Sequence, residues 1–291
     1  MKLIAITSAM RGQAGHGRDN YPRISAVRSL STEESTRYED AVRYLHEFYA
    51  SRELLPVVTA AEADLHETVQ KILTNNPKHE LSPRQRATLT RDVNRALFHY
   101  LASVRLYLDH TQTRLSRRYG DTSEPYIAFK RSTGREYDSL VAYRVLYHLR
   151  NFIQHCGMPI HGIGVSRRLD PETEEVIHYV RIACSVDSLL TRFSGWGKVR
   201  ADLQASGELL EPHTLVPAMT SALIRVDKTV FSAEQHHLIG AAASITNLLN
   251  EVRAPGTYGT VGDLQLDGES YNLQMLDPPL ELLDALGFNV R

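Results

Sequence analysis

Residues 138–157, DSLVAYRVLYHLRNFIQHCG, predict the helix around which the rest of the chain is arranged. Apolar side chains recur every three or four residues, the spacing that gives a helix one buried face. Gly157 and Pro159 predict where the helix ends, because glycine favours the C-terminal cap and proline cannot extend a helix. The expected buried stripe consists of Ala142, Val145, Leu146, Leu149, Phe152, Ile153 and Cys156.

The opposite face of this predicted helix carries groups that can bind phosphate or transfer protons. Guanidinium groups neutralise phosphate charge, and histidine changes its protonation state near neutral pH. Each group also has an ordinary interpretation, as a solvated surface residue or, for the tyrosines, as half-buried packing. The polar side chains are Arg144, His148, Asn151 and His155 at helical spacing, flanked by Tyr143, Tyr147, Arg150 and Gln154.

Composition places the chain among soluble globular proteins. Its 291 residues suffice for one large domain or two modest ones. We expect no membrane association, since no apolar run reaches the length of a membrane span and the N-terminus lacks a convincing signal segment. Cys156 and Cys184 do not make a disulfide framework or a zinc ligand set, so the default is a cytoplasmic protein without metal or other cofactor.

Charge is unevenly distributed along the chain. The total is −1, yet residues 81–118 carry net +6, residues 125–168 carry net +5 and residues 169–291 carry net −9. Positive charge is therefore concentrated around the central helix, as a phosphate-bearing partner would require. The alternative is that these arginines pair with the acidic segments inside the fold.

The periodicity along the chain predicts a mostly α-helical protein. Residues 1–30 are expected to form an arm with a short edge strand at KLIAIT, and residues 121–137 a basic loop. The pattern changes to a period of two after Pro159, which predicts a β-hairpin inserted at about 161–185. Residues 254–291 are expected to be an acidic tail with Gly and Pro and a short closing helix at 280–286. Helices are expected at 31–55, 57–74, 82–118, 138–157, 188–193, 197–206, 212–231 and 233–252.

An arginine followed by a histidine after four to six intervening residues occurs three times: Arg11–His16, Arg105–His110 and Arg150–His155. The spacing alone is weak, because chance produces it about this often in a chain of this composition. The first pair lies in the predicted arm and the second inside a long helix. Only the third ends an amphipathic helix at a Gly/Pro stop and has a polar residue, Asn151, after the arginine.

This RNFIQH segment, residues 150–155, resembles the motif of the HEPN superfamily, whose helical-bundle domains occur in RNA-cleaving toxins and antiviral defence proteins. The likeness is loose over residues 31–253 and better over 81–160. It implies a helical bundle with extended termini and a homodimeric, metal-independent endoribonuclease, with Arg150, His155 and Asn151 as catalytic residues. It also allows an antitoxin or another regulatory protein as a partner. Expected RNA contacts are Arg144, His148, Tyr147, Lys130, Arg131 and Arg135.

The chemistry fits this resemblance. A ribose 2′-hydroxyl that attacks the adjacent phosphorus needs a proton acceptor, the leaving 5′-oxygen needs a donor, and a guanidinium offsets the charge of the phosphorane. Five residues on an ideal helix, at about 100° each, place Arg150 and His155 roughly 140° apart. Two copies of the helix would therefore be needed to assemble one site.

A non-catalytic helical module that binds a protein or nucleotide is the alternative. In that case Arg150 and His155 would be a structural pair in an inactive member of the superfamily, and Asn151 a solvent-exposed side chain. The acidic residues 255–291 could also screen the basic face, which predicts higher RNA affinity when they are deleted.

Overall fold

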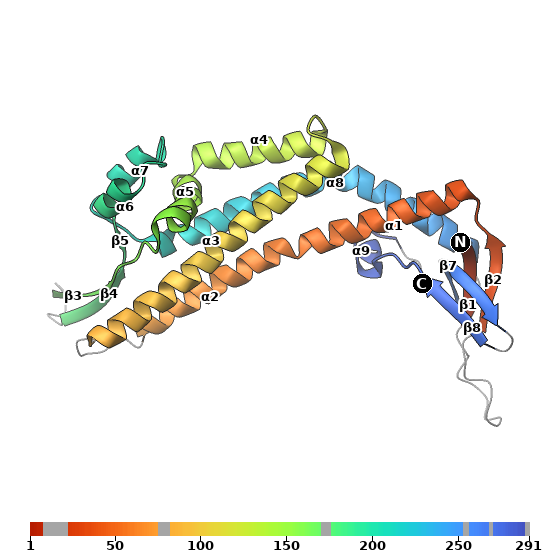
Figure 1. Ribbon diagram of the computed structural model, residues 1–291, viewed down its shortest axis with the longest axis horizontal. Coiled ribbons are helices and arrows are strands. Elements are labelled where there is room, and N and C mark those ends of the chain that lie inside the picture. Colours follow the sequence, from red (N-terminus) through yellow and green to blue (C-terminus); the bar gives the residue numbers. More distant parts are fainter. Residues whose placement is uncertain (8–22, 75–81, 170–175, 253–255, 268–269, 289–291) are drawn as a thin grey trace, which may run out of the picture. The chain divides into compact units, whose positions relative to one another are not determined.

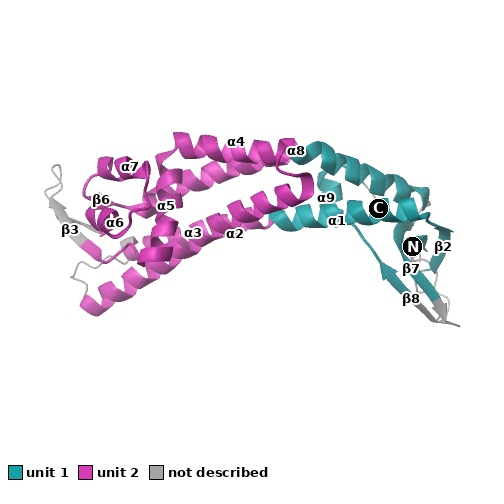
Figure 2. Cartoon of the chain, turned by 45° about the horizontal axis from the view of Figure 1, so that its top comes forward, with its two compact units in different colours: residues 1–52, 234–291 teal, residues 53–233 magenta. Residues whose placement is uncertain are grey.

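The computed structural model describes residues 1–7, 23–74, 82–169, 176–252, 256–267 and 270–288. The described chain is mostly helical with small antiparallel sheets, which confirms the predicted mostly α class (Figure 1). It divides into two compact units, residues 1–52 with 234–291 (unit 1) and residues 53–233 (unit 2), as Figure 2 shows. The predicted arm, helical domain and tail, divided at 30/31 and 253/254, do not coincide with these units.

Unit 2 is built around α3 (Pro83–Tyr119), with α2 (Leu54–Thr74) packed along it. The start of α3 was predicted from Ser82-Pro83 and is confirmed as a capping box. The Gln85 N–H donates to Ser82 Oγ at 3.3 Å, and the Ser82 N–H donates to Gln85 Oε1 at 2.9 Å. These reciprocal bonds satisfy donors that the first helical turn leaves without partners.

The predicted basic loop at 121–137 is wrong, because Glu124–Ser139 form helix α4. Ser123 caps its start, accepting a hydrogen bond from the Tyr126 N–H at 3.5 Å, and proline occupies the first turn. The buried face of α4 gives the physical reason for the helix, since its members recur at helical spacing. This face consists of Pro125, Ala128, Phe129, Ser132 and Glu136.

The rest of unit 2 follows the expected order. Helix α5 (Val141–Cys156) corresponds to the predicted central helix. The predicted hairpin is confirmed as β3 (Ile163–Leu169) paired with β4 (Val176–Ile182), and its turn lies outside the described residues. Strands β5 (Cys184–Ser185) and β6 (Leu209–Leu210) pair with each other. Helices α6 (Val186–Arg192) and α7 (Val199–Ala205) lie between these two strands in the sequence. The helices expected at 212–231 and 233–252 are one helix, α8 (Pro212–Leu249), which belongs to unit 2 up to Ala233 and to unit 1 from Glu234, and a 3₁₀ turn at Asn250–Val252 continues it.

Unit 1 contains a four-stranded antiparallel sheet made from both ends of the chain. Its order is β2 (Arg23–Ser29), β1 (Lys2–Thr7), β7 (Thr257–Asp267) and β8 (Ser270–Met275). The segments expected to be an N-terminal arm and a C-terminal tail thus supply the strands of one sheet, and KLIAIT is an inner strand instead of an edge strand. The predicted closing helix is confirmed as α9 (Leu280–Ala285).

Two glycines of β7 allow the backbone to pack closely. A Cβ atom at Gly259 would lie 2.6 Å from the carbonyl oxygen of Leu249, the last residue of α8. A Cβ atom at Gly262 would overlap the Gln274 carbonyl oxygen of the neighbouring strand β8. Glycine at these two positions is therefore a packing requirement of the sheet, although in the sequence it looks like a feature of a loop.

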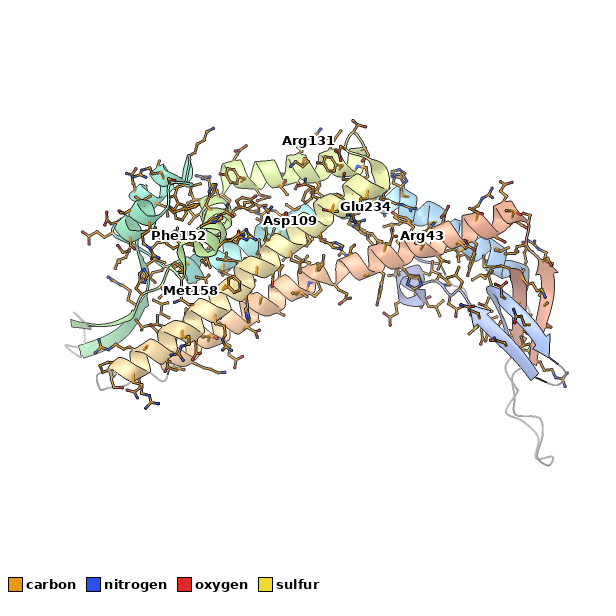
Figure 3. The ribbon with its side chains drawn as sticks, in the orientation of Figure 1. Arg43, Asp109, Arg131, Phe152, Met158 and Glu234 are labelled. Carbon is orange, nitrogen blue, oxygen red and sulfur yellow. The ribbon has the colours of Figure 1, made fainter. Side chains whose placement is uncertain are left out.

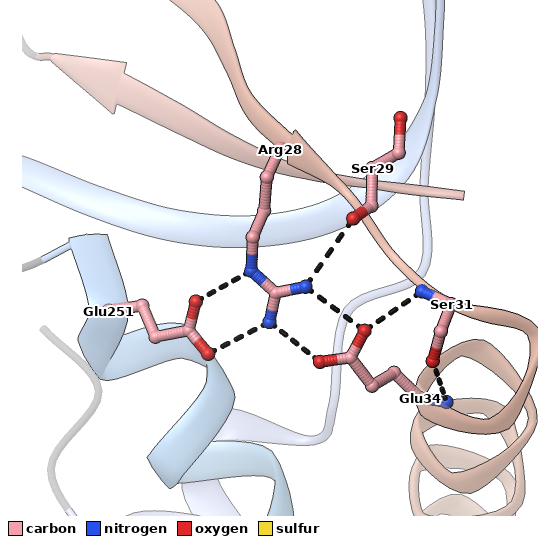
Figure 4. Close-up of polar contacts among 5 residues, drawn as sticks. All are labelled: Arg28, Ser29, Ser31, Glu34 and Glu251. Atoms are coloured by element: carbon pink, nitrogen blue, oxygen red, sulfur yellow. Dashed lines mark hydrogen bonds and ion pairs between the residues drawn. The ribbon is translucent and has the colours of Figure 1, made fainter.

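Arg28 ties together three elements of unit 1 (Figure 4). From β2 its guanidinium donates to Glu251 in the 3₁₀ turn and to Glu34 in the first turn of α1 (Thr32–Arg52), each at 2.8 Å. Glu34 also accepts from the Ser31 N–H at 2.8 Å, completing the helix start that the sequence predicted. The hydrogen bond from Arg28 is the main cause that lowers the pKa of Glu34 to about 2.

Candidate functional site

The buried stripe of α5 agrees with the prediction at six of its seven positions, with Cys156 only half-buried. The Cys156 thiol donates to the Arg192 carbonyl oxygen at 3.1 Å. Tyr143 is also buried, and burial raises the pKa of its hydroxyl. Gly157 ends the helix at φ 96°, with its N–H donating to the Ile153 carbonyl at 3.2 Å, which confirms the predicted stop.

Arg144 holds α5 to its neighbours within unit 2. Its Nε and Nη2 donate to the two carboxylate oxygens of Asp202 on α7 at 2.6 and 2.8 Å. Nη1 donates to the carbonyl oxygens of Tyr137 and Asp138 at the end of α4. The guanidinium lowers the pKa of Asp202 through these hydrogen bonds. The guanidinium of Arg144, which was expected to contact RNA, is thus hydrogen-bonded to other residues of unit 2.

His148 also bonds to other parts of unit 2. Its Nε2 lies 2.9 Å from the Tyr137 hydroxyl, and its Nδ1 lies 3.0 Å from the carbonyl oxygen of Gly195. The ring is also packed near Trp196, with centroids 6.4 Å apart. Because both ring nitrogens have partners, the geometry gives His148 a positioning role between α4 and the segment before α7.

Tyr147 is tied to α3. Its hydroxyl accepts from Nη1 of Arg105 at 2.6 Å, and the same guanidinium lies 5.6 Å from the ring centroid. Arg105 in turn pairs with Asp109 at 2.7 Å. The ring is half-buried and meets Tyr137 edge-on. This arrangement matches the packing interpretation of Tyr147, and stacking on an RNA base remains a prediction.

Arg150 and Asn151 line a small depression between α5 and α3, next to Tyr147 and Arg105. Arg150 donates to Gln154 Oε1 and, at 3.4 Å, to Asn151 Oδ1. Both side chains are half-exposed. These bonds join neighbours on the surface of α5.

His155 is exposed and has a different neighbourhood from Arg150. Its ring stacks on Phe193, with centroids 6.3 Å apart and planes 12° apart. Within the part of the chain that the structure describes, no contact joins His155 to Arg150. The roughly 140° separation predicted from an ideal helix thus brings the two side chains to different neighbouring elements.

Sequence reasoning missed Arg192 and His161, which lie at the C-terminal end of α5. Nη1 of Arg192 lies 3.0 Å from Nε2 of His161, and its Nη2 donates to the carbonyl oxygen of Cys156. The guanidinium also lies 5.3 Å from the ring centroid of Phe152. Phe152 and Met158, labelled in Figure 3, mark the last turn of α5 and the segment that follows. No local sequence signal connects Arg192 with this turn.

Lys130, Arg131 and Arg135 are all exposed, but they lie on α4 and not in a loop. Arg131 is labelled on this helix in Figure 3. Their role in RNA contact stays a prediction.

Among the residues that the structure describes, no group of three or more His, Cys, Asp or Glu side chains is arranged to hold a metal ion. No helix within the described ranges is long and apolar enough to cross a membrane.

Comparison of the chain with protein-family models, curated proteins and solved structures found no match. The resemblance to the HEPN superfamily therefore rests on residues 150–155 and their place at the end of a core helix.

Proposed function

We propose that the protein is a metal-independent endoribonuclease that acts as a homodimer. The observation that carries this proposal is the division of polar groups along α5. Arg144, His148 and Tyr147 are bonded to neighbouring elements, whereas the last turns present Arg150, Asn151, Gln154 and His155 at the surface. The groups that RNA cleavage requires are thus the ones a substrate can reach.

In the proposed reaction the ribose 2′-oxygen attacks the adjacent phosphorus and the bond from phosphorus to the 5′-oxygen breaks. A base accepts the 2′-hydroxyl proton, and an acid donates a proton to the leaving 5′-oxygen. His155 supplies proton transfer, Arg150 offsets the additional negative charge of the phosphorane, and Asn151 hydrogen-bonds the phosphate. The products are a 2′,3′-cyclic phosphate and a free 5′-hydroxyl. Unpaired RNA is the expected substrate, since in-line attack needs a splayed nucleotide.

The homodimer follows from the separation of Arg150 and His155. Arg150 lines a depression between α5 and α3, whereas His155 stacks on Phe193. A second copy that presents its own Arg150 to His155 would complete two equivalent sites related by two-fold symmetry. The same symmetry brings Asn151 to each site together with Arg150.

The test compares wild-type protein with His155→Ala on mixed cellular RNA in the presence of EDTA. We expect wild-type protein to leave cyclic phosphate ends and single-stranded DNA to resist, because DNA has no 2′-hydroxyl. His155→Ala should lose activity by about a hundredfold or more, the usual contribution of a general acid or base. His110→Ala is the matched control, since His110 is exposed on α3 and has the same spacing from an arginine. Equal cleavage by both variants would contradict the proposal.

An interaction module is the second candidate function, and one observation favours it. Arg150 is bonded to Gln154 and Asn151 on its own helix, as expected for a structural surface cluster. In this case wild-type protein and His155→Ala would both leave RNA intact. Retention of unchanged RNA by both proteins would then identify binding without cleavage.

A further inference from the structure

A second arginine and a second histidine adjoin the last turn of α5. The two terminal nitrogens of Arg192 reach His161 Nε2, at 3.0 Å, and the carbonyl oxygen of Cys156. Because a guanidinium only donates, Nε2 of His161 is the acceptor and the ring proton of the neutral histidine lies on Nδ1. Arg192 therefore fixes both the orientation and the tautomer of His161.

Aromatic rings hold Arg192 and His155 on adjoining surfaces. The Arg192 guanidinium lies over Phe152 at 5.3 Å, and His155 stacks on Phe193. Phe152 and Phe193 meet edge-on with centroids 6.2 Å apart. Both rings also contact Trp196, which is 1% exposed and so anchors them to the core. One rigid aromatic cluster thus supports both functional groups.

The three polar side chains can meet a ligand from solvent. His155, His161 and Arg192 are all exposed. A guanidinium has five N–H donors in a planar fork, and the two described hydrogen bonds of Arg192 occupy one donor on each terminal nitrogen. The remaining donors match the oxygens of a phosphate, which the planar fork of a guanidinium can bind in a bidentate manner.

We propose that Arg192, His161 and His155 form a phosphodiester-binding site within one protomer, which rests on the ribonuclease function proposed above. Arg192 binds the non-bridging oxygens of the scissile phosphate. His155 accepts the 2′-hydroxyl proton and returns it to the leaving 5′-oxygen, while the Nδ1–H of His161 donates a hydrogen bond to a phosphate oxygen. Arg150 then reaches the same phosphate from the second copy of the chain.

The first experiment follows the ring NMR signals of His155 and His161 in the full chain as inorganic phosphate is added. We expect both signals to shift together and to saturate. Arg192→Gln should weaken the apparent phosphate affinity about tenfold, because it removes charge-assisted hydrogen bonds. Arg200→Gln, an exposed arginine on α7, is the matched control and should respond like wild type. Absent shifts, or equal shifts in Arg192→Gln and wild type, would overturn the site.

A dinucleotide with a 2′-deoxy linkage separates a diester from a free oxyanion. It cannot be cleaved, and it should shift the same two signals at lower concentration than phosphate does. A response to phosphate alone would overturn the assignment to a diester. His161→Gln guards against a folding defect in Arg192→Gln, since His161 is exposed, and it should reduce the His155 response without changing the melting temperature.

Mixed dimers test whether the three residues act in one protomer. Arg192→Gln mixed with Arg150→Ala should recover about a quarter of wild-type cleavage, since half the dimers are mixed and each has one intact site. Arg192→Gln mixed with His155→Ala should recover none. If Arg192→Gln alone cleaves at the wild-type rate, this inference fails and the ribonuclease stands. If wild-type protein does not cleave but the phosphate response depends on Arg192, the ribonuclease fails and the binding site stands.

Discussion

Arg144 and Arg150 share the polar side of α5, but their guanidinium groups have different surroundings. Arg144 makes a bidentate pair with Asp202, and both side chains are only 19% exposed. Arg150 remains half-exposed and bonds only to neighbours on its own helix among the described contacts. The periodicity placed both on one polar face and could not distinguish them, because the partner of Arg144 is 58 residues away in the chain.

Replacing Arg144 with alanine should lower the free energy of unfolding by about 2–4 kcal/mol, because Asp202 would stay largely buried without its cation. Chemical denaturation measures this loss. Arg200→Ala, an exposed arginine on the same helix as Asp202, is the control and should change stability by about 0.5 kcal/mol or less. Equal midpoints for the two variants would show that the pair adds nothing.

The ion pair between Arg144 and Asp202 also predicts that the free energy of unfolding depends on pH in acid. The pKa of Asp202 in the folded protein lies below its ordinary value of 3.8, because Arg144 donates hydrogen bonds to the charged form. Its stabilisation is therefore complete above that ordinary value and is lost as the pH falls toward the folded pKa. Arg144→Ala should consequently lose less stability than wild type between about pH 5 and pH 2.

The helices and strands differ in how well the local sequence predicts them. Helix α5, the start of α3, the hairpin and α9 could be predicted because caps, stops and periodicity are local signals. For α4 the Ser-Thr-Gly segment obscured a buried stripe that includes Ala128 and Phe129, and Ser123-Glu-Pro125 was the overlooked start signal. Strand β7 gave no local signal, because its stability comes from pairing with β1, which is about 250 residues distant.

Gly259 allows a sharp test of how β7 packs. Gly259→Ala should reduce the free energy of unfolding by about 1–3 kcal/mol, because the new methyl group would meet the Leu249 carbonyl oxygen at 2.6 Å. Gly240→Ala, with no atom within 4 Å of its Cβ position on α8, is the control. That change should stabilise by about 0.5–1 kcal/mol, as alanine favours helix. A neutral result for Gly259→Ala in thermal denaturation would contradict the close packing.

For the molecule as a whole, the main difference from the sequence prediction is the part played by the two chain ends. Composition predicts an acidic tail at residues 254–291. Instead β7 and β8 are half of a sheet whose other half is β2 and β1. The higher RNA affinity expected on deletion of these residues stays a prediction. The candidate site could likewise be predicted only in part. The RNFIQH segment at the end of α5 was visible in the sequence, whereas Arg192 and His161 come to this helix end only through tertiary contacts.

Deleting residues 255–291 should therefore unfold unit 1, because β1 would lose β7, one of its two partner strands, and only β2 and β1 of the four-stranded sheet would remain. Hydrogen exchange measures the outcome directly. We expect the amides of β1 to lose protection while those of α3 and α5, which have their own core in unit 2, keep it. Continued protection of β1 in the truncated chain would contradict this account.

The pairing of β1 with β7 also sets an order of events during translation. Strand β1 leaves the ribosome long before β7 is synthesised, since Thr7 and Thr257 meet across 250 residues. The whole of residues 53–233 emerges in the interval and can form its helices without the C-terminal strands. Unit 1 is thus the last part to close, although β1 is made before residues 53–233. Until then KLIAIT can pair only with β2, and its other edge stays open to association with other chains.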